Sequence, residues 1–177
     1  MIIREAKLED AEAIAKVNVD TWHTTYRGII PESYLARLSY QKRKESWTKL
    51  LSDNKQENKQ YFVYVVENNL KRIIAFADGG LARNGDSSYQ GELYAIYILE
   101  AYQRQGIGRK LVKTIAEKLY QLGLKSMLVW VLADNPACQF YQALGGQKVQ
   151  QKQVEFDGVK LNKIAYGWID IKVLLAT

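Results

Sequence analysis

The stretch from Glu92 to Leu132 restricts the possible folds of this chain more than any other part. Residues 92–98 are apolar enough to form a central strand, and 126–132 have the composition of a second strand. The helix between them carries an apolar stripe and stops at Gly123, a residue type suited to a left-handed cap; the stripe comprises Ile107, Leu111, Ile115, Leu119 and Leu122. A strand, a helix and a strand in so few residues predict a right-handed crossover between two parallel strands.

A glycine-containing turn joins the first of these strands to the helix. It reads Gln103-Arg104-Gln105-Gly106-Ile107-Gly108-Arg109-Lys110 and is rich in amides and positive charge. A helix start offers unpaired backbone N–H groups and the positive end of the helix dipole, and glycines let a phosphate approach the main chain. The turn is therefore a candidate anion-binding site, although an ordinary strand-to-helix connection can have the same composition.

The first part of the chain is predicted to be mainly helical. Ile2 to Ala6 has the pattern of a short strand, and a helix follows from Asp10 with its apolar residues on one face. A second helical region runs from Ile30 to about Leu51 and is expected to break around Ser39-Tyr40. Ser52 to Gln60 is polar and is predicted to be a loop.

Two hairpins are predicted, one on each side of the crossover. The first begins at Tyr61, turns at Asn68-Asn69, which tolerate left-handed geometry, and has its second strand from Leu70 to Asp78. The second covers Lys148 to Ile169 and turns at Asp157-Gly158, among the strongest short hairpin signals. The sheet is therefore mixed, antiparallel at its beginning and end and parallel in the middle.

The remaining segments connect these units. Gly79-Gly80 is followed by a polar loop from Arg83 to Gln90. Asn135-Pro136 starts a further helix, because an Asn side chain caps exposed N–H groups and Pro fits a first turn. That helix is predicted to end at Gly145-Gly146. The fold class is therefore α/β in the broad sense that includes α+β, with helices packed on a mixed sheet.

Composition indicates a single domain over residues 1–177. The chain is 47% hydrophobic, which is enough to bury a core at this length. One cysteine, Cys138, can form no internal disulfide, and one histidine, His23, excludes a His-rich metal site, so no metal is expected. The start of the chain lacks the pattern of an export signal, and no apolar run approaches the roughly 20 residues that span a bilayer, so we expect a cytoplasmic protein with no membrane partner.

Charge and motif spacing narrow the ligand class. The net charge of +6 favours polyanionic ligands. No helix shows a dense basic stripe with exposed aromatic residues, so nucleic acid is not expected as a partner. A dinucleotide fingerprint would need a third glycine where Leu111 stands, and the Gly-Lys-Ser/Thr of a P-loop is absent.

Two motifs together resemble the GCN5-related N-acetyltransferase (GNAT) family. Gln103 to Gly108 matches the Gln/Arg-x-x-Gly-x-Gly/Ala signature of the family and lies between a strand and a helix, as it does there. Asn135, Tyr141 and Gly145 resemble the second signature, at a plausible distance and in the right order. Gly146-Gln147 departs from the Gly-Phe that the family often has. The resemblance covers the whole domain and implies a mostly antiparallel sheet of about seven strands with a central, splayed parallel pair, flanked by about four helices.

The resemblance implies acetyl-CoA as co-substrate. Its pyrophosphate would lie on the N–H groups of Gln105 to Arg109, and its pantetheine arm would pair with the backbone of Ile96 and Ile98 where the strands part. The N–H of Ile96 would stabilise the oxyanion. The full set implied to bind the cofactor is Ile96, Tyr97, Ile98, Gln103, Arg104, Gln105, Gly106, Ile107, Gly108, Arg109 and Asn135.

The same resemblance implies two catalytic side chains for transfer to a primary amine by direct attack in a ternary complex. Tyr141 occupies the usual position of the general acid, and Glu92 one where some members carry a base that acts through water. Each has a structural alternative. Tyr141 lies on an apolar helix face, Glu92 would suit a solvated strand end, and Asn135 is explained by capping alone.

The acceptor amine is left open by the sequence. Trp22 and Tyr26 lie in the segment where this family commonly builds the acceptor side, and aromatic rings there could hold an amine. Acidic residues of the last hairpin, Glu155 and Asp157, could attract a cation. A homodimer is compatible with the sequence, and the alternative function is a non-catalytic acyl-CoA-binding or sensing domain of the same fold.

Overall fold

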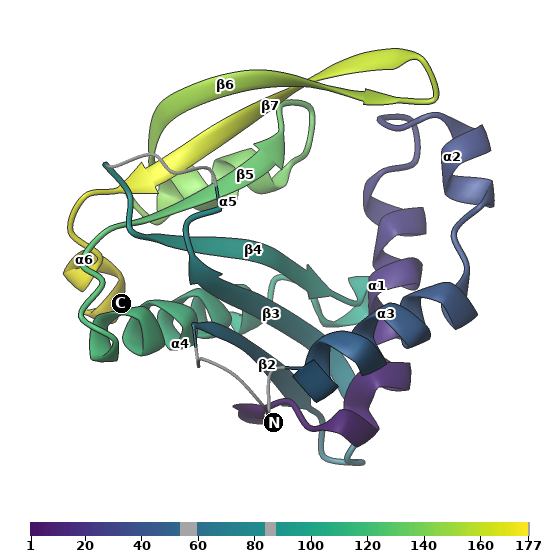
Figure 1. Ribbon diagram of the computed structural model, residues 1–177, viewed down its shortest axis with the longest axis horizontal. Coiled ribbons are helices and arrows are strands. Elements are labelled where there is room, and N and C mark those ends of the chain that lie inside the picture. Colours follow the sequence, from purple (N-terminus) through teal and green to yellow (C-terminus); the bar gives the residue numbers. More distant parts are fainter. Residues whose placement is uncertain (54–59, 84–87, 177) are drawn as a thin grey trace.

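The computed structural model describes residues 1–53, 60–83 and 88–176. Figure 1 shows one sheet with helices on both of its faces. The described strands form a seven-stranded sheet in the order β1-β2-β3-β4-β5-β7-β6. Their bounds are Ile2–Glu5 for β1, Tyr61–Glu67 for β2, Ile73–Leu81 for β3, Gly91–Ile98 for β4, Met127–Leu132 for β5, Gln147–Phe156 for β6 and Val159–Trp168 for β7. Only the β4–β5 pair is parallel among them, which confirms the predicted crossover.

Six α-helices lie in the part of the chain that the structure describes. They are α1 (Ala11–Thr25), α2 (Glu32–Ala36), α3 (Tyr40–Asp53), α4 (Ile107–Gln121), α5 (Ala137–Ala143) and α6 (Lys172–Leu175). The count exceeds the expected four because the predicted break near Ser39 separates α2 from α3 and because α6 was not foreseen. Helix α6 forms where Ile171 and Leu174 are buried in the core that also includes α4.

The two faces of the sheet are covered by different helices. Four residues of the predicted α4 stripe, Ile107, Leu111, Ile115 and Leu119, are buried in the largest core cluster with residues of β2 to β5 and β7. Leu122 follows the end of the helix and is 40% exposed, so the stripe ends one turn earlier than predicted. Helices α1 and α3 pack on the other face, where Ile14 and Leu51 join Val65 and Phe76. The sheet therefore separates the α4 layer from the α1 and α3 layer.

A β-bulge in β4 decides which side chains face each layer. Asp78 pairs with Ala95, but Gly79 pairs with Leu93, so Tyr94 is an extra residue in β4. An extra residue shifts the alternation of the strand, and Leu93 and Ile96 consequently both face the α4 core. The sequence pattern gave no sign of this bulge.

The parallel strands separate at the middle of the sheet. The β4–β5 ladder contains three pairs and ends at Leu93 and Val129, although β4 continues to Ile98 and β5 to Leu132. The last residues of β4 therefore have no strand partner on the β5 side. The predicted splayed pair is confirmed, and the mixed fold of the GNAT type with it.

The two predicted hairpins differ in their outcome. Asp157 and Gly158 both have positive φ, at 49° and 81°, so this turn is confirmed. The prediction at Asn68-Asn69 is wrong in detail, because the left-handed residue is Lys71 at φ 58°. The side chain of Asn68 instead accepts bonds from the N–H groups of Leu70 and Arg72, at 2.9 and 3.0 Å. This local hydrogen bonding delays the start of β3 to Ile73.

Two element ends differ from the prediction: β3 and α3 both extend further along the chain than the sequence suggested. Strand β3 continues through Gly79 and Gly80. The backbone of Gln60 lies so close to Gly80 that a Cβ there would be 2.1 Å from the Gln60 carbonyl oxygen, and only glycine permits this approach. Ser52 belongs to α3. Most of the two predicted polar loops, at 54–59 and 84–87, lies outside the described residues.

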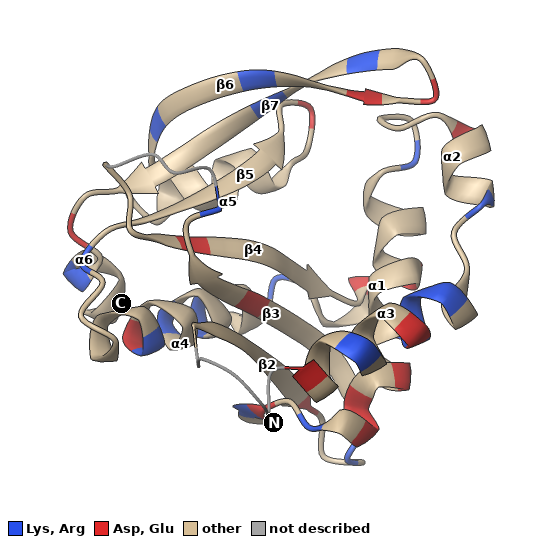
Figure 2. Ribbon diagram, in the orientation of Figure 1, with Lys and Arg blue, Asp and Glu red and all other residues tan. Residues whose placement is uncertain are grey.

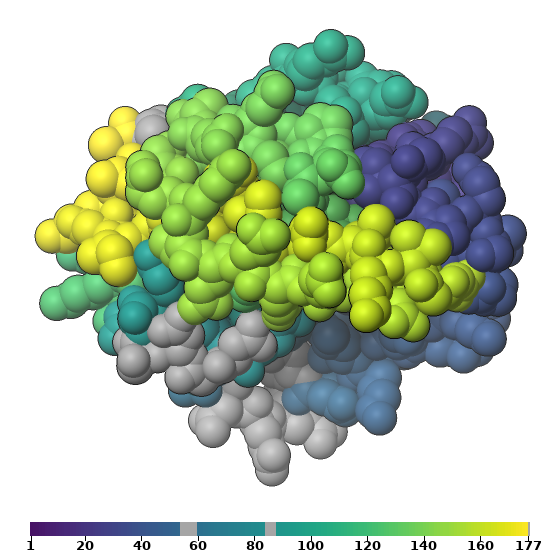
Figure 3. Space-filling model, turned by 90° about the horizontal axis from the view of Figure 1, so that it is seen from above, coloured from purple at the N-terminus to yellow at the C-terminus, as the bar shows by residue number. Residues whose placement is uncertain are grey.

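The tip of the β6–β7 hairpin reaches the N-terminal helices. Asp157 forms an ion pair with Arg37 and accepts a hydrogen bond from Ser33 at 2.7 Å. Figure 3 shows the yellow-green hairpin extending across the molecule to the purple and blue segments. Asp157 is thus engaged with α2 and its neighbour, which weighs against its predicted attraction for an acceptor. Within the described ranges, no helix is long and apolar enough to cross a membrane.

Candidate active site

The start of α4 presents a row of free backbone donors. Gly106 has φ 79° and Arg104 φ 59°, so the chain turns sharply before the helix. The N–H of Gln103 donates to Glu100 at 3.1 Å, and the next N–H of the described turn with a carbonyl partner is that of Lys110, which donates to Gly106 at 3.2 Å. The N–H groups from Gln105 to Arg109 precede it and have no such partner. This is the arrangement that binds an anion at a helix N-terminus.

Three side chains of the turn stabilise the turn itself, although the sequence suggested that they bind the cofactor. The amides of Gln103 and Gln105 donate to the carbonyl oxygens of Ile98 and Ala101, at 2.9 and 3.1 Å, and so brace the turn. Ile107 is buried in the core. The turn is therefore held in place by its own residues.

Positive charge accompanies these backbone donors. Arg104, Arg109 and Lys110 are all exposed. Gly108 packs beside Phe140, and a Cβ there would lie 3.1 Å from that ring. The donors and the charges together fit the pyrophosphate of a nucleotide-type cofactor.

The end of β4 presents a second set of backbone groups. The N–H of Leu99 donates to Ile74 at 3.0 Å, which places the N–H groups of odd-numbered neighbours on the β3 side. Those of Ile96 and Ile98 consequently point to the opposite side, where the ladder with β5 has ended. An extended ligand could pair there like an added strand.

Tyr141 is buried in the core cluster against which Ile96 and Ile98 also pack. It is 3% exposed, and its ring contacts those of Phe140, Tyr166 and Trp168 at centroid distances of 5.3, 6.0 and 6.4 Å. No hydrogen bond to its hydroxyl occurs among the described residues. Burial, followed by the nearby Tyr26 hydroxyl and Cys138 thiol, raises the pKa of Tyr141 above its usual value. The ring is thus a core residue, and its hydroxyl is a protonated group at neutral pH.

Several predicted residues from distant segments gather around Tyr26 of α1. Its hydroxyl lies beside the side chains of Tyr97 and Asn135, which offset part of the rise in its pKa that burial causes. Trp22 packs on Tyr26 at 4.8 Å. Burial likewise raises the pKa of Tyr97, with Tyr26 as the next cause. The structure therefore brings together residues predicted for acceptor binding, cofactor binding and acid catalysis.

Asn135 serves as a helix cap. Its side-chain oxygen accepts a hydrogen bond from the N–H of Ala137 at 2.9 Å, and its N–H donates to Leu132 at 3.0 Å. The predicted capping is confirmed. The amide group of the same side chain is next to Tyr26, so capping leaves a donor that faces the site.

Glu92 is not the solvated carboxylate that one interpretation of the sequence suggested. It is 1% exposed and accepts hydrogen bonds from Arg83 through the backbone N–H at 3.0 Å, Nε at 3.2 Å and Nη2 at 2.5 Å. The guanidinium of Arg83 also lies 4.1 Å from the centre of the Tyr94 ring. Glu92 is therefore part of a fixed ion pair.

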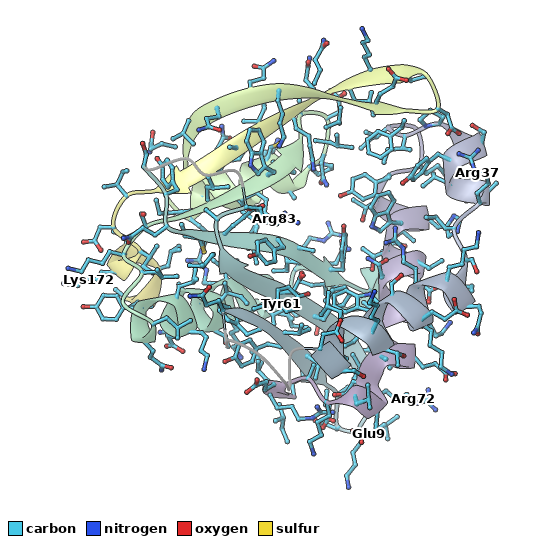
Figure 4. All side chains as sticks on the ribbon, in the orientation of Figure 1. Glu9, Arg37, Tyr61, Arg72, Arg83 and Lys172 are labelled. Carbon is cyan, nitrogen blue, oxygen red and sulfur yellow. The ribbon has the colours of Figure 1, made fainter. Side chains whose placement is uncertain are left out.

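A second buried carboxylate, which sequence reasoning missed, lies one strand away. Asp78 of β3 is 6% exposed, and it accepts a hydrogen bond from the Tyr61 hydroxyl at 2.8 Å. Figure 2 shows the acidic positions of β3 and β4 near the middle of the sheet, and Figure 4 shows the labelled Tyr61 and Arg83 in the same central region. An aspartate that ends an apolar strand directly before two glycines is the sequence signal that could have identified it.

Comparison with known proteins gives consistent matches. The FR47-like protein family matches residues 78–154. The uncharacterized N-acetyltransferase YuaI of Bacillus subtilis (strain 168) is 42% identical over 172 residues, which are 97% of this chain and 95% of YuaI. The spermidine N(1)-acetyltransferase of Thermoplasma acidophilum is 26% identical over 153 residues, 84% of this chain and 88% of that protein. A crystal structure of PaiA N-acetyltransferase from Thermoplasma acidophilum in complex with coenzyme A has a TM-score of 0.70 at 20% identity, covering 92% of this chain and 96% of that one.

These relatives, together with the splayed sheet and the turn before α4, define an acyltransferase. The identity with YuaI extends over nearly the whole chain, so the likeness is not confined to one motif. The chain belongs to the GCN5-related N-acetyltransferase family.

Proposed function

We propose that this chain transfers the acetyl group of acetyl-CoA to a primary amine of a small molecule or peptide, by direct attack in a ternary complex. The observation that carries the proposal is the row of N–H groups from Gln105 to Arg109, which have no carbonyl partner in the described chain and follow the open edge of β4 in sequence. The coenzyme A complex of the PaiA relative supports the choice of cofactor. We further infer one cytoplasmic catalytic domain over residues 1–177 that uses no metal.

Binding of the cofactor is assigned to two backbone segments. The turn before α4 would hold the pyrophosphate through its N–H groups, with Arg104 and Arg109 adding charge. The N–H groups of Ile96 and Ile98 and the C=O of Ile96 would pair with the pantetheine arm, because the C=O of Ile98 accepts from Gln103. Acetyl-CoA supplies the thioester when bound. The N–H of Ile96 would then donate to the oxygen on which negative charge develops.

The chemical step needs an acid for the departing thiolate. Tyr141 is suited to this, because its hydroxyl is protonated and uncommitted to another described residue. Asn135 and Tyr97 would hold the hydroxyl network around Tyr26 in place. Trp22 and Tyr26 would contact the acceptor amine, in keeping with the amine that the name of the spermidine acetyltransferase relative specifies. Glu92 was predicted to act as a base through water. Because Arg83 donates to both oxygens of its carboxylate, we assign it to holding the acceptor side of the site in place instead.

We expect acetyl-CoA and CoA to raise the melting temperature of the protein. A ligand at about 100 times its Kd stabilises by roughly 2.7 kcal/mol, which is several degrees for a chain of this length. Differential scanning fluorimetry measures the shift. A chain that responds to neither compound does not bind the cofactor, and the proposal is then wrong.

A panel of amines separates an enzyme from a sensing domain. Release of free thiol from acetyl-CoA should depend on the amine, with polyamines, amino acids, aminoglycosides and peptide N-termini as the panel. Binding of acetyl-CoA without transfer to any amine would favour the non-catalytic domain. Size-exclusion chromatography with light scattering would test for a homodimer in the same samples.

Charge reversal at the turn should weaken acetyl-CoA binding. Arg104→Glu combined with Arg109→Glu places two negative charges beside the proposed pyrophosphate, and we expect the Kd to rise at least about 10-fold. Isothermal titration calorimetry at low and high salt measures the change, which should shrink as salt screens the charges. Lys125→Glu, an exposed reversal beyond the other end of α4, is the control and should leave the Kd unchanged. An effect of Lys125→Glu about half as large as that of the double variant would show that only net charge matters.

A further inference from the structure

Asp78 carries a buried oxygen that the fold leaves unused. Its Oδ2 accepts the hydrogen bond from Tyr61, whereas Oδ1 is buried and has no hydrogen-bond partner in the described parts of the chain. An unsatisfied buried carboxylate oxygen is costly, and each such group in a native protein calls for an explanation, of which a catalytic role is one. The backbone N–H groups of Ala95 and Asp78 lie near the carboxylate and lower its pKa, but neither makes a hydrogen bond of normal geometry to Oδ1.

The position of Asp78 connects this oxygen with the proposed reaction centre. Asp78 pairs with Ala95 at the bulge of β4, and residues paired across antiparallel strands have Cα atoms about 5 Å apart. Ala95 directly precedes Ile96, whose N–H is our candidate donor to the thioester oxygen. Asp78 also lies on the face that carries Phe76, two residues before it, and this face is covered by α1. The carboxylate is thus on the acceptor side of the sheet, one residue from the oxyanion donor.

The groups around Asp78 suit a cationic amine. Tyr61 stacks on Tyr94 at 5.6 Å, and these rings lie next to the carboxylate. The charged or titratable groups that interact with Asp78 are Tyr61, Arg83, Tyr94 and Tyr97. Arg83 is the only cation among them and is committed to Glu92.

Helix α1 adds further uncommitted polar atoms on the face that carries Ile14. Asn18 Oδ1 and Thr21 Oγ1 are buried without a hydrogen-bond partner in the described ranges. Residues 18 and 21 follow Ile14 at helical spacing, and Ile14 packs on the sheet with Phe76. An ammonium group offers three donors and no acceptor, so oxygens of this kind match it.

We propose that Asp78 is the general base that takes a proton from the acceptor ammonium, an assignment that rests on the proposed acetyl transfer. The Oδ1 oxygen accepts one proton and leaves a neutral amine, whose lone pair forms the new C–N bond as the thioester carbonyl becomes an oxyanion. Collapse of this intermediate breaks the C–S bond, and the thiolate takes the proton of Tyr141. The attacking nitrogen loses its second proton to restore Tyr141, and Asp78 releases the first proton to water.

The acidity of Asp78 fits this role. Burial raises the pKa of its carboxyl to about 7, although Tyr61, Arg83 and the backbone N–H of Ala95 act in the opposite direction. A base with this pKa is unprotonated above pH 7 and is most effective near the pH at which the enzyme works. We therefore expect kcat/KM to rise with pH through about 7.

Asp78→Asn tests the assignment directly. The amide keeps the shape of the side chain but cannot take the proton, and we expect kcat/KM to fall at least about 100-fold and to lose its rise near pH 7. The Kd for acetyl-CoA should stay within about 2-fold, because the cofactor binds elsewhere. A folded Asp78→Asn protein with the rate and the pH profile of the wild type would overturn the proposal. If the wild type itself transferred acetyl to no amine while binding acetyl-CoA, the proposed function would fail instead.

Tyr61→Phe provides a second test that needs no change at Asp78. The Tyr61 hydroxyl lowers the pKa of Asp78, so its removal should move the rise in kcat/KM to higher pH. Tyr64→Phe, on the same strand but packed against the opposite core, is the matched control and should not move the profile. A profile unchanged by Tyr61→Phe would contradict the assignment even if Asp78→Asn failed to fold.

Discussion

Replacing Tyr141 by phenylalanine is expected to lower kcat about 1,000-fold while leaving acetyl-CoA affinity nearly unchanged. General acid catalysis contributes roughly 10² to 10⁴ in rate, and the hydroxyl is the only group that this change removes. The ring contacts with Phe140, Tyr166 and Trp168 all remain in the variant. Because the hydroxyl makes no hydrogen bond to another described residue, its loss leaves no buried partner unsatisfied, and the free energy of unfolding should change by less than about 1 kcal/mol.

Thiol release at saturating acetyl-CoA and amine measures this effect. Tyr141 has a pKa raised by burial, so the acid stays protonated through the neutral range and its titration should reduce kcat only at strongly alkaline pH. Tyr120→Phe, on the exposed surface of α4, is the control and should retain full activity. Unchanged turnover in Tyr141→Phe would leave Tyr141 as a core aromatic alone, as its apolar helix face also suggested.

The parts of the fold that were predicted correctly are those encoded by neighbouring residues. Asp157-Gly158 specifies its turn because both positions need positive φ, and the stripe of α4 specifies a buried helix by its period. The crossover follows from element order and handedness. Each of these signals acts over a few residues, so no tertiary information was required.

The parts that were missed depend on contacts between distant segments. The bulge at Tyr94 arises from the register of β3 against β4, and the continuation of β3 through Gly80 depends on the approach of Gln60. Alternation within one strand cannot show either feature. Helix α6 forms because Leu174 is buried near α4, which its short sequence does not reveal.

In the candidate site, too, the features encoded by neighbouring residues were predicted, and those that depend on distant contacts were missed. The motifs located the turn before α4 and placed Tyr141 on the helix after β5, but they could not show that Gln103 and Gln105 brace the turn. Asp78 and Arg83 were missed because their significance depends on burial and on a partner in space. The sequence placed Glu92 correctly on β4, whereas only the structure shows that it is paired with Arg83.

The second large expected effect is a loss of stability when the Arg83–Glu92 ion pair is broken. Arg83→Met should lower the free energy of unfolding by about 3 kcal/mol, because it leaves the carboxylate of Glu92 buried without its counter-charge. Urea denaturation at neutral pH measures the loss. Arg72→Met, an exposed change at the first hairpin, is the control and should cost less than about 0.5 kcal/mol.

A double variant distinguishes an unpaired charge from lost packing. Arg83→Met combined with Glu92→Leu removes both charges, and although the Arg83 side chain is 58% exposed, no buried charge then remains without a partner. The single variant is expected to lose about 3 kcal/mol of the free energy of unfolding, and we expect the double variant to recover most of this loss. If the double variant were as unstable as the single one, the contacts of the Arg83 side chain with Tyr94 would be the stabilising element, and Glu92 would tolerate burial without a partner.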